Sequence, residues 1–147
     1  MKQIEKITFM PRTSAKVHQP GEKSILISVH DASEPQLIPE GNFQNILYLR
    51  FHDTDEQDGV LTPFDKNHAK WIFSFLKRNT EAKELVVHCT MGVSRSAAIA
   101  IFFSEMLGVQ CEREGLKVNY QTWPMYNKLV YRVLCNYHNN IMEGNDA

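Results

Sequence analysis

Residues 88–96, HCTMGVSRS, decide the fold that this sequence predicts. The apolar run LVV precedes them at 85–87, and the longer apolar run AAIAIFF follows at 97–103. This order is typical of a buried strand, a tight loop and a helix. A loop that leads straight into a helix presents free backbone N–H groups, which bind anions. We therefore expect an anion-binding loop between a strand and a helix.

The side chains of this stretch are suited to phosphate chemistry. Cys89 stands at the end of the expected strand, where the helix dipole and Arg95 favour its nucleophilic thiolate form. Arg95 carries a planar fork of donors that matches two phosphate oxygens. Gly92 permits a turn at a place where a side chain would clash with the anion or with backbone. Nucleophile, backbone donors and guanidinium are thus expected in one loop.

The stretch resembles the signature of the cysteine-dependent phosphatases, His-Cys-x5-Arg-Ser/Thr, in particular that of the compact dual-specificity-like branch. The likeness extends more loosely over residues 45–135. Its firmest positions are His88, Cys89, Gly92, Arg95 and Ser96. It implies a protein-tyrosine or dual-specificity phosphatase that works through a cysteinyl-phosphate intermediate. The phosphate would bind to Thr90, Met91, Gly92, Val93, Ser94 and Arg95.

The neighbouring residues have supporting roles in this interpretation. Ser96 can donate a hydrogen bond to the sulfur of Cys89 when the sulfur leaves the phosphoenzyme. His88 is expected to bond backbone and to shape the loop, with some help to the thiolate, and not to act as a base. Ser94 is ambiguous, because it could serve only to cap the helix that follows.

Thiolate attack on a phosphate monoester also needs an acid for the departing oxygen and a base for the later water, and one carboxylate can serve as both. The resembling enzymes keep this aspartate on a loop a few dozen residues before the cysteine. Residues 50–58, RFHDTDEQD, supply such a loop after an apolar run. We predict Asp53 as the general acid, with Asp55 and Asp58 as the alternatives.

The rest of the chain predicts one α/β domain over residues 1–147. Apolar runs at 24–29 and 45–51 indicate strands, and residues 4–9 could form an edge strand. Strands that alternate with helices imply right-handed crossovers. We therefore expect a mainly parallel, four- to five-stranded central sheet flanked by helices on both faces. The loops of Cys89 and Asp53 would then open at the same edge of the sheet.

Three helices are predicted around these strands. The first has Thr62 as its N-cap and Pro63 at its first helical position. The second covers residues 94–107 and ends at Gly108. The last shows apolar residues at helical spacing over 126–137.

Composition restricts the classes of function. The formal net charge of −1 argues against a nucleic-acid partner or a basic membrane-binding surface. No apolar stretch approaches the length of a membrane span, and the N-terminus lacks the core of a signal peptide, so we expect a cytoplasmic protein. Cys89, Cys111 and Cys135 form no CxxC pair, as in a reduced intracellular protein. The sequence leaves open whether Cys111 or Cys135 can trap Cys89, and which oligomer forms.

The loop also bears on the substrate. Thr90, Met91 and Val93 include no lysine, whereas the phosphoinositide-selective relatives place basic residues at such positions. We expect a phosphorylated protein or peptide, with phosphotyrosine favoured, and no metal or other cofactor, since the histidines show no metal-ligand spacing. Two alternatives stay open. One is a phosphatase for a nucleotide, an RNA 5′ end or another small phosphate ester, and the other is a catalytically silent phosphate-binding module.

Overall fold

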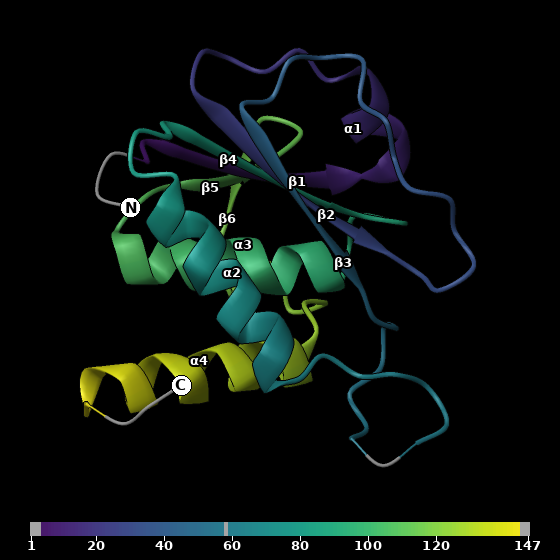
Figure 1. Cartoon of the computed structure of the whole chain (residues 1–147), viewed down its shortest axis with the longest axis vertical. Coiled ribbons are helices and arrows are strands. Elements are labelled where there is room, and N and C mark those ends of the chain that lie inside the picture. Colours follow the sequence, from purple (N-terminus) through teal and green to yellow (C-terminus); the bar gives the residue numbers. More distant parts are fainter. Residues whose placement is uncertain (1–3, 58, 145–147) are drawn as a thin grey trace.

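The computed structural model of the chain describes residues 4–57 and 59–144 (Figure 1). The elements in chain order are β1 (Lys6–Pro11), α1 (Arg12–Val17), β2 (Ser24–His30), β3 (Asn45–Arg50), α2 (Lys66–Arg78), β4 (Glu84–Cys89), α3 (Arg95–Leu107), β5 (Cys111–Arg113), β6 (Leu116–Val118) and α4 (Lys128–Met142).

The strands form one six-stranded sheet in the order β3-β2-β4-β1-β5-β6. Neighbouring strands are parallel except for the antiparallel β5–β6 hairpin. The mainly parallel sheet is confirmed, but it has more strands than the four to five predicted, because β5 and β6 are too short to show an alternating pattern. β1 pairs with both β4 and β5, so the predicted edge strand lies inside the sheet.

Helices cover both faces of the sheet, as predicted, but unequally (Figure 1). Successive residues of a strand point to opposite faces. Ile25 and Ile27 of β2 belong to the large core beneath α2, α3 and α4. Leu26, between them, belongs to a smaller cluster with Ala15 of the short α1. The larger helical layer therefore lies on one face, and α1 with the chain after β2 covers the other.

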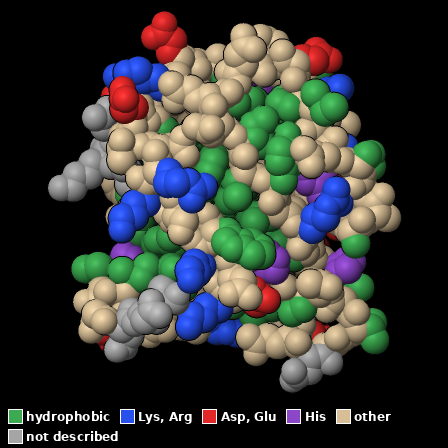
Figure 2. Space-filling view, viewed as in Figure 1, with side chains coloured by type: hydrophobic (Ala, Val, Ile, Leu, Met, Phe, Trp, Pro, Cys, Tyr) green, Lys and Arg blue, Asp and Glu red, His purple; other side chains and the backbone are tan. Residues whose placement is uncertain are grey.

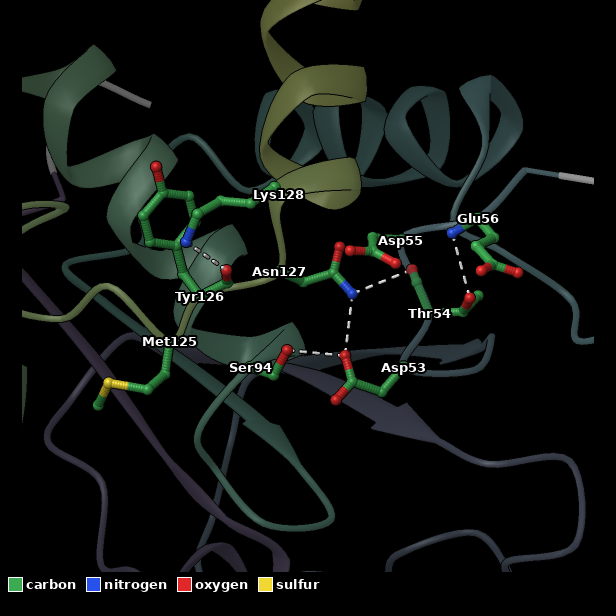
Figure 3. Close-up of a pocket in the computed structure, with 9 residues that line it drawn as sticks. All are labelled: Asp53, Thr54, Asp55, Glu56, Ser94, Met125, Tyr126, Asn127 and Lys128. Atoms are coloured by element: carbon green, nitrogen blue, oxygen red, sulfur yellow. Dashed lines mark hydrogen bonds between the residues drawn. The ribbon is translucent and has the colours of Figure 1, made fainter. Parts of the chain in front are cut away.

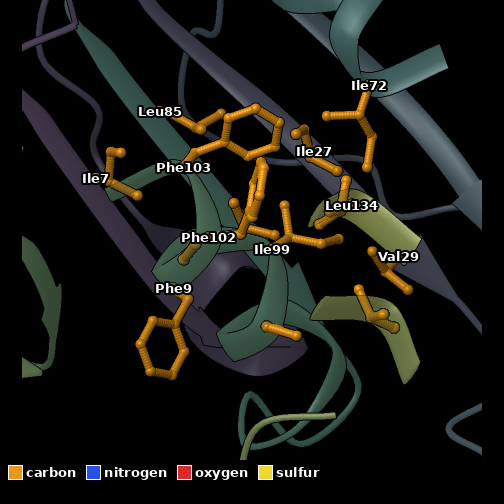
Figure 4. Packing of buried hydrophobic residues seen from close by; sticks show 14 of the residues in the cluster. Ile7, Phe9, Ile27, Val29, Ile72, Leu85, Ile99, Phe102, Phe103 and Leu134 are labelled. Carbon is orange, nitrogen blue, oxygen red and sulfur yellow. The ribbon is translucent and has the colours of Figure 1, made fainter. Parts of the chain in front are cut away.

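The central element of the large core is α3. Its residues from Arg95 to Phe103 are all buried. Ile99, Phe102 and Phe103 pack among side chains from the sheet and from α2 and α4 (Figure 4). A helix enclosed in this way cannot slide or rotate without opening cavities. Its first turn, which follows Cys89 after five residues, is therefore held rigidly.

The outer surface is mixed. On the face seen in Figure 2, Lys and Arg side chains are spread among uncharged surface and scattered acidic groups. Within residues 4–57 and 59–144, none of the helices combines the length and apolar character that crossing a membrane would require.

The first predicted helix begins later than expected. Asp65, and not Thr62, is the N-cap of α2: its carboxylate accepts from the N–H groups of Asn67 and His68, at 2.9 and 3.2 Å. The His68 ring in turn accepts from the N–H of Asp65 at 3.0 Å, which completes a capping box. The Thr62 backbone is instead paired with His52 at the base of the preceding loop.

We predict that Asp65→Ala lowers the free energy of unfolding by about 1 kcal/mol, the usual effect of removing an N-cap. Thr62→Ala should change it by less than about 0.5 kcal/mol, because the Thr62 contacts given above are made by backbone. Urea denaturation of both variants measures the difference. A larger loss in Thr62→Ala would show that the helix start predicted from sequence is the correct one.

Candidate active site

The residues predicted to bind phosphate form a tight loop between β4 and α3. β4 ends at Cys89 and α3 begins at Arg95. Gly92 has a φ of 65°, in the left-handed region that favours glycine. A Cβ there would lie 2.2 Å from the N of Pro11 and 2.4 Å from the carbonyl carbon of Met10. The loop thus packs directly on the end of β1, and Gly92 is required both by φ and by space.

Residues after the loop in sequence hold its carbonyl groups outward. The Arg113 guanidinium donates from Nε to the oxygen of Gly92 at 2.7 Å, and Trp123 donates from Nε1 to the oxygen of Val93 at 2.8 Å. The Arg113 guanidinium also lies over the Trp123 ring, 5.2 Å from its centroid. Trp123 therefore supports the loop from a position five residues before the start of α4 at Lys128.

This arrangement turns backbone donors toward the centre of the loop. In a trans peptide the C=O and the following N–H point in opposite directions. The described residues contain no cis peptide bond. Because the oxygens of Gly92 and Val93 are bonded outward, the N–H groups of Val93 and Ser94 point inward. The backbone geometry at Gly92 and Val93 is therefore compatible with the anion-binding loop expected from the sequence.

Cys89 lies at the base of the cradle. Its side chain is almost fully buried, with 2% of the residue exposed. Two groups of Ser96, in the first turn of α3, contact its sulfur: the hydroxyl oxygen at 3.1 Å and the backbone N–H, whose nitrogen is 3.4 Å away. The structure thus brings Ser96 to the sulfur, where a donor can stabilise negative charge.

Arg95 is buried and fixed from three sides. Its Nη1 donates to the Asp31 carboxylate at 2.7 Å and to the carbonyl of Phe51 at 2.8 Å. Its Nη2 donates to the Thr90 hydroxyl at 3.2 Å. The guanidinium plane is therefore oriented before any ligand arrives, which is the preorganisation that an anion clamp requires.

Two acidic residues at this site, Asp31 and Glu34, were missed by the sequence reasoning. Glu34 accepts from the Thr90 hydroxyl at 2.8 Å and from the N–H of Asp31 at 2.7 Å. Burial raises the pKa of Glu34, but these two hydrogen bonds, with the Arg12 and Arg95 charges, outweigh burial and lower it. A signal did exist: Asp31 directly follows β2 and Glu34 lies three residues further on, and in a parallel sheet β2 ends at the same edge as β4.

The predicted general acid also reaches the loop. Asp53 accepts at Oδ1 from the Ser94 hydroxyl at 2.7 Å and from the Asn127 amide at 2.9 Å (Figure 3). Ser94 precedes α3 but makes no capping bond with its side chain. Asp55 is exposed and has no such link to the loop among the described contacts, while Asp58 lies outside the described residues. Of the two described candidates, Asp53 is the one that the structure joins to the phosphate loop.

An open pocket of about 460 Å³ lies beside this junction (Figure 3). Its lining residues are Asp53, Thr54, Asp55, Glu56, Ser94, Met125, Tyr126, Asn127 and Lys128. Carboxylates from the loop after β3 form one wall, and the segment leading into α4 forms the other. The pocket extends the site outward from the phosphate loop.

His88 is placed behind the loop. Its ring is fully buried, with Nε2 2.5 Å from the Ser28 hydroxyl and Nδ1 3.5 Å from the carbonyl of Cys89. Because a carbonyl can only accept, this geometry assigns the ring proton to Nδ1 and makes Nε2 the acceptor. Burial lowers the pKa of His88 to about 4, so the ring is neutral near pH 7. This matches a role in shaping the loop.

Cys111 lies too far from Cys89 to trap it as a disulfide. In β1, Ile7 pairs with Cys111 and Pro11 pairs with Cys89, on opposite sides. Two strand spacings and four residues of strand give a Cα separation of roughly 16 Å, far beyond disulfide range. Burial, with Glu112, raises the pKa of Cys111 to about 12, and burial raises the pKa of Cys135.

In the described part of the chain, no group of three or more His, Cys, Asp or Glu side chains is placed to hold a metal ion.

We predict a pH dependence of stability that comes from His88. An unfolded histidine binds a proton below its ordinary pKa of 6.5, whereas folded His88 stays neutral down to about 4. Stability present above pH 6.5 is therefore lost as the pH falls toward 4. Between pH 7 and pH 5, urea denaturation should show the wild type losing about 2 kcal/mol more than His88→Gln. An equal loss in both proteins would contradict this assignment.

Comparison with known proteins supports the fold. The chain matches the crystal structure of human tyrosine phosphatase-like serine/threonine/tyrosine-interacting protein with a TM-score of 0.53 and 19% sequence identity, over 90% of each chain. No protein-family model and no curated protein matches the sequence. At this identity the likeness concerns the fold alone. The chain has the α/β fold of a tyrosine phosphatase-like protein.

Proposed function

We propose that this protein is a phosphate monoester hydrolase of the protein-tyrosine or dual-specificity type, acting through a cysteinyl-phosphate intermediate. The observation that carries the proposal is the position of Cys89. Its sulfur lies at the N-terminus of α3, within a loop that turns N–H groups inward, and Ser96 donates to it from the backbone. A silent phosphate-binding module would need the cradle and Arg95 but no thiol at this point.

In the proposed first step, the Cys89 thiolate attacks phosphorus while the bond from phosphorus to the ester oxygen breaks. The inward N–H groups and Arg95 stabilise the charge on the three remaining phosphate oxygens. Asp53 gives its proton to the departing oxygen. The products of this step are the free alcohol and a phosphorylated Cys89.

In the second step, water attacks the phosphorus of the phosphoenzyme. Asp53, now a carboxylate, takes a proton from this water, the S–P bond breaks, and phosphate is released. Ser96 lies 3.1 Å from the sulfur and can donate to it as the thiolate re-forms. The reaction balances with water alone, and the residues named supply every proton transfer.

The surroundings of the loop favour a single phosphate on a peptide side chain, with phosphotyrosine preferred. Met91 is 70% exposed at the loop and offers an apolar contact. The pocket beside the loop carries Asp53, Asp55 and Glu56, which would repel a polyanion.

All three cysteines are free thiols, which agrees with a reducing compartment such as the cytoplasm.

Cys89→Ser tests the function directly. The variant should fold and bind phosphate or vanadate, but it should lose essentially all turnover, because a serine hydroxyl is hardly ionised near neutral pH. Release of phosphate from p-nitrophenyl phosphate, with and without chelator, measures this for wild type and variant. Appreciable turnover in Cys89→Ser would exclude the covalent mechanism, and an inactive wild type that still binds vanadate would indicate a silent module.

The acid is tested with a matched pair of variants. Asp53→Asn should lower kcat by roughly 10² to 10⁴ for esters with poor leaving groups, and much less for p-nitrophenyl phosphate, whose leaving group needs little protonation. It should also flatten the basic limb of the pH profile. Asp55→Asn, two residues away in the same loop, should keep both features of the wild type. If Asp55→Asn shows these losses and Asp53→Asn behaves like the wild type, Asp55 is the general acid.

A substrate panel tests the preference for phosphotyrosine. We expect a phosphotyrosyl peptide to exceed a phosphoseryl peptide, a nucleotide and an inositol polyphosphate in kcat/KM, measured side by side. If the kcat/KM of a nucleotide or an inositol polyphosphate is tenfold higher than that of the phosphotyrosyl peptide, a difference of about 1.4 kcal/mol, this choice of substrate is wrong.

A further inference from the structure

We infer that Asn127 is a positioning residue that holds the general acid Asp53 over the phosphate loop; this inference rests on the proposed function. Asn127 is buried, with 6% of the residue exposed, and lies just before α4. Its amide nitrogen donates to Oδ1 of Asp53 at 2.9 Å and to the carbonyl of Thr54 at 3.1 Å. Two consecutive residues of the acid loop are therefore attached to one side chain.

The same residue is joined to two other elements. Its side-chain oxygen accepts from the N–H of Val130 at 2.9 Å and so caps α4. Its backbone N–H donates to the carbonyl of Ser94 at 3.0 Å, at the end of the phosphate loop. Asn127 thus connects α4, the acid loop and the start of α3 through separate polar groups.

Capping alone does not explain why asparagine stands here. Serine, threonine and aspartate cap helices about as well, since each supplies an oxygen. Among the preferred N-cap side chains, only asparagine joins that oxygen to an NH₂ group with two donors. Both functions of the amide are used at Asn127, which indicates that the donor side serves the acid loop.

The acid loop needs such an attachment. Its base is closed by Phe51 and Phe64, whose rings pack edge to face with centroids 5.0 Å apart, and by backbone pairing of His52 with Thr62. Beyond this base the chain stands out from the body of the molecule (Figure 1). Asp53 is the first residue past the base and is exposed. The bonds from Asn127 and Ser94 hold it toward the phosphate loop.

The two bonds also select which oxygen carries the proton. The Ser94 hydroxyl and the Asn127 amide both donate to Oδ1 of Asp53. In Figure 3 the second oxygen points away from both donors. Because Oδ1 already accepts two hydrogen bonds, we expect the acid form of Asp53 to carry its proton on Oδ2. Asn127 therefore fixes the place of the carboxyl group and leaves Oδ2 as the oxygen available to a leaving group.

Asn127→Ser separates positioning from capping, because serine keeps an N-cap oxygen and removes the amide donor. We expect kcat to fall about tenfold or more for phenyl phosphate, a poor leaving group, and less than about threefold for p-nitrophenyl phosphate. The basic limb of the pH profile should flatten as well. In an Asp53→Asn background, the further loss with phenyl phosphate should be less than about twofold, because the group that Asn127 positions is no longer an acid.

Asp65→Ala is the control, since it removes the N-cap of α2, outside the pocket. It should leave the ratio of the two kcat values and the pH profile unchanged. Equal losses on both esters in Asn127→Ser, or losses that add fully to those of Asp53→Asn, would overturn the inference and make Asn127 purely structural.

A second readout does not depend on turnover. The side-chain ¹H–¹⁵N resonances of Asn127 should shift in Asp53→Ala and stay in place in Asp55→Ala. Unmoved resonances would overturn the inference even in an active enzyme. A wild type that hydrolyses neither ester would refute the proposed function alone, and the resonances would still decide whether Asn127 holds Asp53.

Discussion

The burial of α3 against the sheet is the constraint on which the rest of the site depends. Every residue from Arg95 to Phe103 is enclosed, so the first turn of the helix has one position relative to β4. Cys89 ends that strand, and only five residues separate it from Arg95. With both ends fixed, the loop must turn sharply, and Gly92 allows it to do so against the end of β1. A rigid helix and a short loop thus determine where the sulfur lies relative to its donors.

Enclosing α3 also places the charge of Arg95 inside the protein, where an unpaired cation would be strongly destabilising. The sheet topology provides the partners. β2, β3 and β4 are neighbours and run parallel, so the chain after each of them emerges at one edge. Asp31 follows β2, and Phe51 follows β3. The groups that form hydrogen bonds with the buried guanidinium also orient it as an anion clamp. The same contacts at this edge of the sheet therefore serve both the stability of the fold and the proposed chemistry.

The chain from the end of β5 to the start of α4 completes the site from the other side. Arg113 and Trp123 bond the carbonyl groups of the phosphate loop, and Asn127 attaches the acid loop. None of these contacts could be recognised from the signature, because their partners lie 21 to 74 positions away in the chain. Asp53 itself was predicted from the family resemblance and from its place after a strand, and the structure brings it to Ser94.

What the sequence determined by itself is local: a strand ending at Cys89, a loop that needs glycine, and a helix that ends at Gly108. Those features follow from apolar periodicity, from backbone geometry and from the short separation of Cys89 and Arg95 along the sequence. The tertiary structure alone decided the inner position of β1 and the roles of Asp31 and Asn127 at the site. The reason is that strand pairing and polar contacts between distant segments depend on which surfaces meet after folding, and a pattern within one segment carries no information about its partner.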